Sequence, residues 1–159
     1  MAASDLYAFE ITLHARAAGL EPEGTHADAW GTWPILRVPR EALAVPLAVA
    51  GDAFLAAIAA LERMYAEPDG SFVWTSPRAG PAWQVDGNAC ERAGRLLLVD
   101  LKGSCPEAEF DRLLRACGWP GQPVMMQLVR AAVFLDEPTF RRHARARGAA
   151  GDGPRLRPD

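Results

Sequence analysis

The stretch Leu96-Leu-Leu-Val-Asp-Leu-Lys-Gly-Ser-Cys-Pro-Glu107 joins the most apolar strand-like segment of the chain to the start of a helix. Pro106 suits the first position of a helix. Ser104 and Glu107 have the spacing of a capping box, in which side chains satisfy the free N–H groups at a helix start. The stretch therefore predicts a strand that ends at Lys102, followed directly by a helix that ends before Gly118.

Two shorter strand segments precede Leu96, each after a turn sequence. Glu67-Pro-Asp-Gly70 is type I turn chemistry and leads into a strand over Ser71–Thr75. A second cluster of proline and glycine residues leads into a strand over Ala82–Asp86. Because sequential strands joined by short turns commonly pair as a meander, the sequence predicts that these strands and Leu96–Lys102 form one antiparallel sheet.

The N-terminal part contains one clear strand and one clear helix. Residues 6–15 alternate between apolar and polar side chains, as in a half-buried strand. Residues 16–50 lose this periodicity and contain several prolines and glycines, which predicts a long irregular connection with one extended piece at Ile35–Val38. Asp52 then suits the N-cap of a helix whose apolar spacing continues to Tyr65.

The C-terminal part predicts one long strand and one helix. Val124–Leu135 is apolar enough for a central strand, and a right-handed crossover would make it the parallel neighbour of Leu96–Lys102. Asp136 begins the last helix. The sequence thus predicts a single α+β domain over residues 1–147, with a disordered tail over residues 148–159. Its sheet is mixed but mainly antiparallel, in the order β-α-β-β-β-α-β-α.

Composition narrows the class of protein. Half of the residues are hydrophobic and 23% are charged, which excludes the disordered and collagen-like classes. Cys90, Cys105 and Cys117 form no C-x-x-C pair, which argues against a disulfide framework or zinc ribbon and indicates a reducing compartment. Asp5 interrupts any signal peptide, and the longest uncharged run is too short to span a membrane. We therefore expect a soluble, cytoplasmic protein with no membrane contact.

Charge is distributed unevenly along the chain, whose formal net charge is −3. Residues 137–159 contain six arginines and three acidic residues, whereas the preceding residues carry an excess of acid. The basic C-terminal helix and tail could meet an anionic partner such as nucleic acid. They could equally be a solvated helix and a frayed terminus.

Lys102 is the only lysine among the 17 lysine and arginine residues, and it is the first candidate for site chemistry. Asp100 lies two residues earlier, so both side chains emerge on the same face of a strand. If Arg92–Gly94 forms a three-residue hairpin loop, Asp86 lies opposite Asp100 on the neighbouring strand. Two carboxylates that close repel each other unless a cation such as Mg²⁺ lies between them.

Val85-Asp86 followed by Asp100-Leu101-Lys102 resembles the metal motif of the PD-(D/E)xK nucleases, although Val85 stands where that family has proline. The α-β-β-β-α-β core of that family matches the order expected from Asp52 to Leu135. The resemblance implies that Asp86 and Asp100 bind Mg²⁺ and that Lys102 is catalytic. It suggests Glu62 as a third carboxylate. Such a site would hydrolyse phosphodiesters.

Other readings of these residues stay open. Asp86-Gly87-Asn88 is also hairpin-turn chemistry, in which Asp86 would cap a turn and bind no metal. Cys105 at a helix start could be a reactive thiol or a buried structural residue. His14, His26 and His143 have no metal-binding spacing. The function we expect is therefore a non-catalytic binding or adaptor module with a protein partner, and the alternative is a Mg²⁺-dependent nuclease or a degenerate relative.

Overall fold

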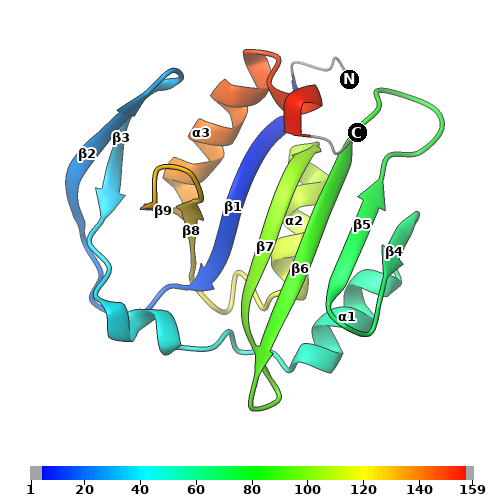
Figure 1. Ribbon diagram of the computed structural model, residues 1–159, viewed down its shortest axis with the longest axis horizontal. Helices are drawn as coiled ribbons and strands as arrows, with labels where there is room; N and C mark the ends of the chain where they lie inside the picture. Colours follow the sequence, from blue (N-terminus) through cyan, green and yellow to red (C-terminus); the bar gives the residue numbers. More distant parts are fainter. Residues whose placement is uncertain (1–4, 157–159) are drawn as a thin grey trace.

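The computed structural model describes residues 5–156 and contains three α-helices and one nine-stranded sheet (Figure 1). The predicted α+β class is confirmed. The sheet has the order β2-β3-β9-β8-β1-β7-β6-β5-β4. Its strands are β1 (Tyr7–Ala15), β2 (Pro22–Asp28), β3 (Gly31–Leu36), β4 (Met64–Ala66), β5 (Ser71–Thr75), β6 (Gln84–Arg92), β7 (Arg95–Cys105), β8 (Val124–Leu128) and β9 (Val133–Asp136). The helices are α1 (Gly51–Ala59), α2 (Glu107–Ala116) and α3 (Glu137–Ala149), with 3-10 helices η2 (Arg40–Ala44) and η3 (Gly153–Leu156).

Strand β1 lies at the centre of the core. Its alternating side chains place Phe9 on the side of the sheet that the helices cover, where its ring packs edge-on against Phe110 of α2 and Phe140 of α3 at centroid distances of 5.2 and 6.2 Å. On the same side, Phe54 of α1 packs against Phe72 of β5. Burial of these rings is the main force that attaches the helices to the sheet.

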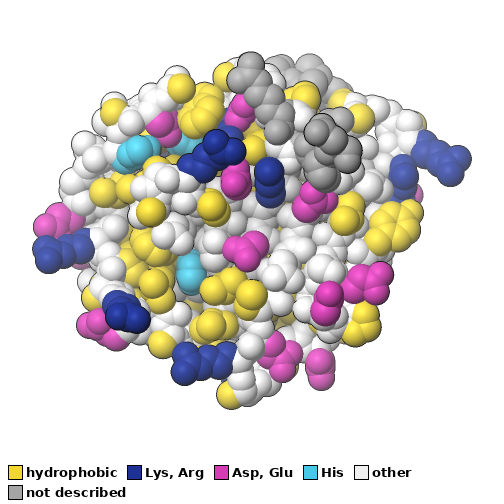
Figure 2. Space-filling view, in the orientation of Figure 1, with side chains coloured by type: hydrophobic (Ala, Val, Ile, Leu, Met, Phe, Trp, Pro, Cys, Tyr) yellow, Lys and Arg dark blue, Asp and Glu magenta, His cyan; other side chains and the backbone are white. Residues whose placement is uncertain are grey.

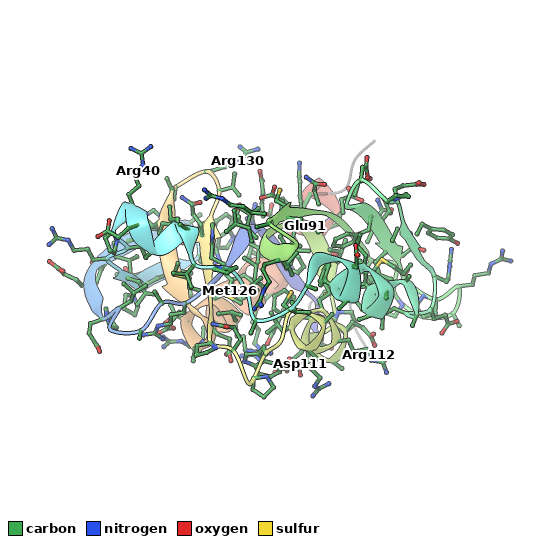
Figure 3. The ribbon with its side chains drawn as sticks, turned by 90° about the horizontal axis from the view of Figure 1, so that it is seen from below. Arg40, Glu91, Asp111, Arg112, Met126 and Arg130 are labelled. Carbon is green, nitrogen blue, oxygen red and sulfur yellow. The ribbon has the colours of Figure 1, made fainter. Side chains whose placement is uncertain are left out.

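The two sides of the sheet therefore differ. Figure 3 shows Asp111 and Arg112 of α2 on one side of the sheet and Arg130, from the turn between β8 and β9, on the other. The second side faces the reader in Figure 1. Helix η3 packs over one end of this second side, where Gly153 approaches Ser104. We call the side of the sheet opposite α1, α2 and α3 the open face.

The predicted parallel neighbours are separated in the structure. Strands β7 and β8 each pair with β1 and run antiparallel to it, so β1 lies between them. All strand pairs within residues 5–156 are antiparallel, so the expectation of a mixed sheet with some parallel pairing is wrong. The physical reason is that β1 is apolar and buried along most of its length, and such a strand gains most by pairing on both edges.

Val124–Leu135 is a hairpin, not one strand. The chain reverses after Leu128, where the Ala132 N–H donates to the Leu128 carbonyl at 2.8 Å. Ala132 takes a positive φ of 57°. Glycine or asparagine usually occupies such positions, and because the turn contains neither, the sequence pattern gave no sign of the reversal.

The expected irregular connection over residues 16–50 contains the β2–β3 hairpin and η2. Asp28 closes this hairpin, since its Oδ1 accepts hydrogen bonds from the main-chain N–H groups of Trp30 (2.9 Å) and Gly31 (3.2 Å). The extended piece predicted at Ile35–Val38 overlaps only the end of β3.

Helix α1 is shorter than predicted. It ends at Ala59, and its N-cap is Ala50, so Asp52 lies in its first turn. Tyr65 belongs to the edge strand β4. The alanine-rich sequence continues a helical pattern after Ala59, but Arg63 takes a positive φ of 60° and turns the chain back into the sheet.

The described part of the expected tail is ordered. Helix α3 begins where predicted, with the Asp136 side chain accepting from the Thr139 N–H at 2.8 Å, but it continues past residue 147 to Ala149. Helix η3 follows, and Leu156 is 3% exposed because it packs on the sheet. Residues 157–159 lie outside the described residues.

Candidate functional site

The open face carries the residues that the sequence singled out. Strand alternation places Asp86 of β6, Asp100 and Lys102 of β7, and Glu10 and Thr12 of β1 on this face. These five residues line one cavity of about 470 Å³. Figure 2 shows this side of the molecule, with acidic side chains spread over its centre and a few basic ones among them. Sequence periodicity thus predicted the shared face of Asp100 and Lys102, and Asp86 lies on the same face although its predicted register differs.

The predicted register between β6 and β7 is wrong. Asp86 lies opposite Lys102, and Asp100 lies opposite Asn88. The hairpin loop has two residues, Ala93 and Gly94, with positive φ angles of 52° and 79°. Loops of this kind match the twist of paired strands, so they are favoured over the expected longer loop even with alanine at the first position. The shorter loop shifts the pairing by one residue, and an irregularity between Cys90 and Glu91 shifts it by one more.

The observed register changes the electrostatics of the open face. Lys102 lies between two carboxylates, with Asp86 opposite it on β6 and Glu10 opposite it on β1. The Gln84 side-chain amide donates to Asp86 at 3.0 Å, and the Thr12 hydroxyl donates to Asp100 at 2.7 Å. Asp86 and Asp100 are diagonal neighbours, a relation in which side-chain origins lie up to about 7–8 Å apart. Asp86 and Asp100 therefore each accept a hydrogen bond from a different side chain.

Two readings from the sequence are corrected here. Asp86-Gly87-Asn88 lies within β6, so Asp86 does not cap a turn. Glu62 is exposed in the segment between α1 and β4, and it does not line the cavity of Asp86, Asp100 and Lys102. Within residues 5–156, no group of three or more histidine, cysteine, aspartate or glutamate side chains is arranged to hold a metal ion.

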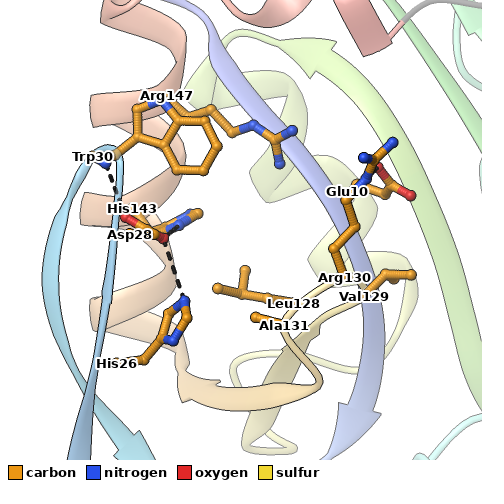
Figure 4. A pocket seen from close by; sticks show the side chains of 10 residues that line it. All are labelled: Glu10, His26, Asp28, Trp30, Leu128, Val129, Arg130, Ala131, His143 and Arg147. Carbon is orange, nitrogen blue, oxygen red and sulfur yellow. Dashed lines mark hydrogen bonds and ion pairs between the residues drawn. The ribbon is translucent and has the colours of Figure 1, made fainter.

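A second cavity, which the sequence did not predict, lies beside the first. Its volume is about 300 Å³, and Glu10 and Val129 border both cavities. Figure 4 shows His26, Asp28 and Trp30 of the β2–β3 hairpin together with His143 of α3 on one side of it. Glu10 and Arg130 lie on the other side. We call this the hairpin pocket.

Asp28 is the centre of the hydrogen bonding in the hairpin pocket. Its Oδ1 accepts from the Trp33 indole N–H at 3.0 Å in addition to the two main-chain donors of the turn. Its Oδ2 lies 2.8 Å from His143 Nε2 and 3.8 Å from His26 Nε2. Burial alone would raise the pKa of the Asp28 carboxyl, but the hydrogen bonds from Trp33, His143 and Trp30 hold it below its usual value. Asp28 is therefore ionised at neutral pH.

His143 is the buried partner of Asp28 and is 2% exposed. The rings of Trp30 and Trp33 pack edge-on against its imidazole, at centroid distances of 5.5 and 5.1 Å. Burial lowers the pKa of His143, and the nearby Asp28 carboxylate only partly opposes this effect. His143 is therefore a neutral imidazole at pH 7, and it connects α3 to the β2–β3 hairpin.

Two arginines border the hairpin pocket. The Arg147 guanidinium lies 4.6 Å from the centre of the Trp30 ring, and it forms an ion pair with Asp152. Arg130 Nε lies 3.5 Å from Glu10 Oε2, but the Arg130 side chain is 84% exposed. Arg147 is thus held in place, whereas Arg130 extends into solvent.

One local pattern in the sequence pointed to the hairpin pocket. His26 and Asp28 are two residues apart, as on one face of a strand, but the surrounding residues had no strand-like periodicity. His143 is 115 residues away from Asp28, and no pattern connects residues at that separation.

The cysteines have no reactive character. Cys105 is the last residue of β7 and is fully buried, and burial raises its pKa well above the usual thiol value. Burial also raises the pKa of Cys117 to about 12 and that of Cys90 by a smaller amount. The reading of Cys105 as a reactive thiol is therefore wrong, because loss of hydration outweighs any effect of the helix start.

None of the helices in residues 5–156 is long and apolar enough to cross a membrane. In comparisons with known proteins, no family model, no curated protein and no solved structure gives a significant match to this chain.

Proposed function

We propose that this chain is a non-catalytic binding module that holds a basic segment of a protein partner on its open face. The supporting observation is the asymmetry of the sheet. Helices α1, α2 and α3 cover one side, and a row of polar and acidic side chains from β1, β7 and β6 occupies the other. We also infer that the protein acts in the cytoplasm, because its three cysteines are free thiols.

The charge of the open face favours a basic partner. Glu10, Asp86 and Asp100 contribute three carboxylates, and Lys102 is the only cation that lines the same cavity in the described residues. Opposite charges across an interface increase the association rate and disfavour wrong partners. A nucleic acid, whose phosphates would approach the same carboxylates, is disfavoured by this surface.

Apolar side chains extend the open face towards the β4 edge. Val73 of β5 lies opposite Asp86, and Tyr65 of β4 lies opposite Val73. Tyr65 is 60% exposed and Val73 is 37% exposed. Exposed aromatic and aliphatic side chains beside charged ones are typical of protein interfaces. The partner segment would therefore combine basic residues with apolar ones.

A labelled peptide of alternating arginine and leucine residues tests this function. We expect it to bind, and we expect a peptide with glutamate in place of arginine not to bind, in fluorescence anisotropy at low salt. Binding should weaken as salt increases, because the attraction is electrostatic. The double variant Asp86→Asn with Asp100→Asn should bind at least fivefold more weakly.

The matched control carries Asp52→Asn and Glu109→Gln, which change the net charge equally but lie on α1 and α2. Equal weakening in both double variants would show that the whole acidic body attracts the peptide, and would contradict a site on the open face. Absence of binding by the arginine peptide would also contradict it.

A Mg²⁺-dependent nuclease is the second candidate function. The observation that favours it is that Asp86, Asp100 and Lys102 line one cavity from adjacent strands. In this proposal the two carboxylates would hold Mg²⁺, and Lys102 would neutralise charge on the phosphoryl oxygens.

Incubation of the purified protein with supercoiled DNA and with RNA, in Mg²⁺ or Mn²⁺, separates the two functions. We expect no cleavage, as for a binding module. Cleavage that disappears in both Asp100→Asn and Lys102→Ala, but persists in the control Glu109→Gln, would instead establish the nuclease. Circular dichroism of each variant would verify that its fold is intact.

A further inference from the structure

We propose that the hairpin pocket binds a small organic cation that donates hydrogen bonds, such as an amine or amidine attached to a planar apolar body. This proposal goes beyond the proposed function, because the hairpin pocket lies beside the cavity of Asp86, Asp100 and Lys102 and has different walls. A volume of about 300 Å³ is within the range of small-molecule sites.

The apolar wall of the hairpin pocket suits a ring or a short hydrocarbon. The Trp30 side chain forms one part of this wall, and Leu128, Val129 and Ala131 from the β8–β9 hairpin form another (Figure 4). Such lining contributes affinity by burial of apolar surface, while a few polar groups determine orientation. The polar groups therefore decide which ligand fits.

His143 presents a hydrogen-bond acceptor that has no donor. Asp28 is ionised and can only accept, so His143 Nε2 carries the hydrogen in their 2.8 Å contact. Because burial keeps His143 neutral, its Nδ1 holds a lone pair. Nδ1 is buried, and no partner for it lies among the described residues. A ligand N–H group would satisfy it.

Glu10 presents a second acceptor. Its Oε2 is buried and has no hydrogen bond from the described residues. The nearest cation is Arg130, at an ion-pair distance of 3.5 Å, and its exposed side chain can move away with little loss of contacts. Lys102 lies opposite Glu10 on β7 but does not line the hairpin pocket. A ligand cation could therefore replace Arg130 beside Glu10.

Neither arginine of the hairpin pocket is free to hold an anion, since Arg130 already lies beside the Glu10 carboxylate. Arg147 is already paired with Asp152 and lies over the Trp30 ring. His143 is neutral and donates to Asp28. A buried acceptor without a hydrogen bond is unfavourable, so His143 Nδ1 and Glu10 Oε2 together favour a donor-rich ligand. The hairpin pocket thus has a surplus of acceptors and selects for positive charge.

Benzamidine and benzoate test the proposal, because they share a planar ring and differ in the sign of their charge. We expect benzamidine to bind the full-length protein in a one-to-one ratio in isothermal titration calorimetry at pH 7.5. Benzoate should bind at least tenfold more weakly. Equal or tighter binding of benzoate would overturn the proposal, as would absence of benzamidine binding.

Because Glu10 borders both cavities, the site is located by the variant Glu10→Gln together with Asp100→Asn. Asp100 lines only the larger cavity, so Asp100→Asn should leave the benzamidine affinity unchanged. Glu10→Gln should weaken benzamidine binding at least fivefold, whereas Glu109→Gln on α2 should leave the affinity unchanged. Unchanged affinity in Glu10→Gln would place any benzamidine elsewhere and overturn the proposal. Benzamidine binding by a protein that fails to bind the arginine peptide would contradict the proposed function while supporting this inference.

Discussion

Replacement of Gly148 by alanine is expected to destabilise the protein by about 3 kcal/mol, which is the upper end of the range for overpacking. A Cβ atom at Gly148 would lie 1.7 Å from the Leu6 carbonyl oxygen and 2.9 Å from its carbon. These are main-chain atoms just before β1, so they cannot move aside as a flexible side chain could. Helix α3 would have to withdraw from β1, with loss of the packing of Phe140.

The sign of this effect distinguishes packing from helix propensity. In an exposed helix, a change from glycine to alanine is favourable by about 1 kcal/mol. Urea unfolding monitored by circular dichroism would measure the free energy of unfolding of the variant. Gly121→Ala is the control, because the nearest atom to its added Cβ is 3.4 Å away and the change should be small. Unchanged or increased stability of Gly148→Ala would show that α3 does not approach β1 this closely.

Asp28→Ala is expected to destabilise the protein by about 3 kcal/mol, because removal of the acceptor leaves several buried donors unpaired. The buried or half-buried donors are the indole N–H of Trp33, the imidazole N–H of His143 and the main-chain N–H of Trp30. The main-chain N–H of Gly31 is exposed, so water can replace Asp28 there. The β2–β3 hairpin should separate from α3, and near-ultraviolet circular dichroism should report the changed environment of the tryptophans.

Asp69→Ala provides the matched control for Asp28. Asp69 also accepts hydrogen bonds in a turn, from the main-chain N–H and the hydroxyl of Ser71, but it lies on the surface, where water can replace it. We expect Asp69→Ala to have a much smaller effect. Similar losses in the two variants would indicate that Asp28 acts only as a turn residue and not as the link to His143.

The same contacts predict how stability depends on pH. The unfolded chain protonates His143 near pH 6.5, whereas burial lowers the pKa of His143 in the folded protein. The unfolded state therefore binds more protons below pH 6.5, and stability falls as the pH is lowered through this range. Buried His14, whose pKa is also lowered by burial, adds to this loss. Below about pH 4, protonation of Asp28 adds a further loss.

Urea unfolding at pH 7.5 and pH 5.5 would measure this decrease, which should be smaller in His143→Gln than in the wild type. The remaining decrease in that variant would be assigned to His14. A wild-type protein with equal stability at the two pH values would contradict a buried neutral His143.

Several elements could be predicted because their signals are local. The proline, aspartate and glycine of residues 67–70 form a turn in which Gly70 has a φ of 98°, as turn chemistry requires. Pro106 indicated the start of α2 to within one residue, and Asp136 indicated the start of α3. Each of these signals depends on residues within a few positions of one another.

The arrangement of the strands could not be read in the same way. The turns at Ala93 and Ala132 use positive φ angles at alanine, which the surrounding strand pairs impose and the sequence does not announce. The two-residue loop in place of the expected three-residue loop and the irregularity between Cys90 and Glu91 each shift the pairing by one residue, which is why Asp86 was expected opposite Asp100 but lies opposite Lys102.

The sequence by itself determined that Asp100 and Lys102 share one face of a strand, because side-chain direction in a strand alternates with a fixed period of two. That Asp86 joins them depends on the register of β6, which the two-residue loop and the irregularity after Cys90 set. Only the tertiary structure decided which of them are direct neighbours, since register depends on loop geometry. It alone also produced the hairpin pocket. Asp28 and His143 meet across 115 residues, and that contact exists only after the aromatic core has placed α3 beside the β2–β3 hairpin.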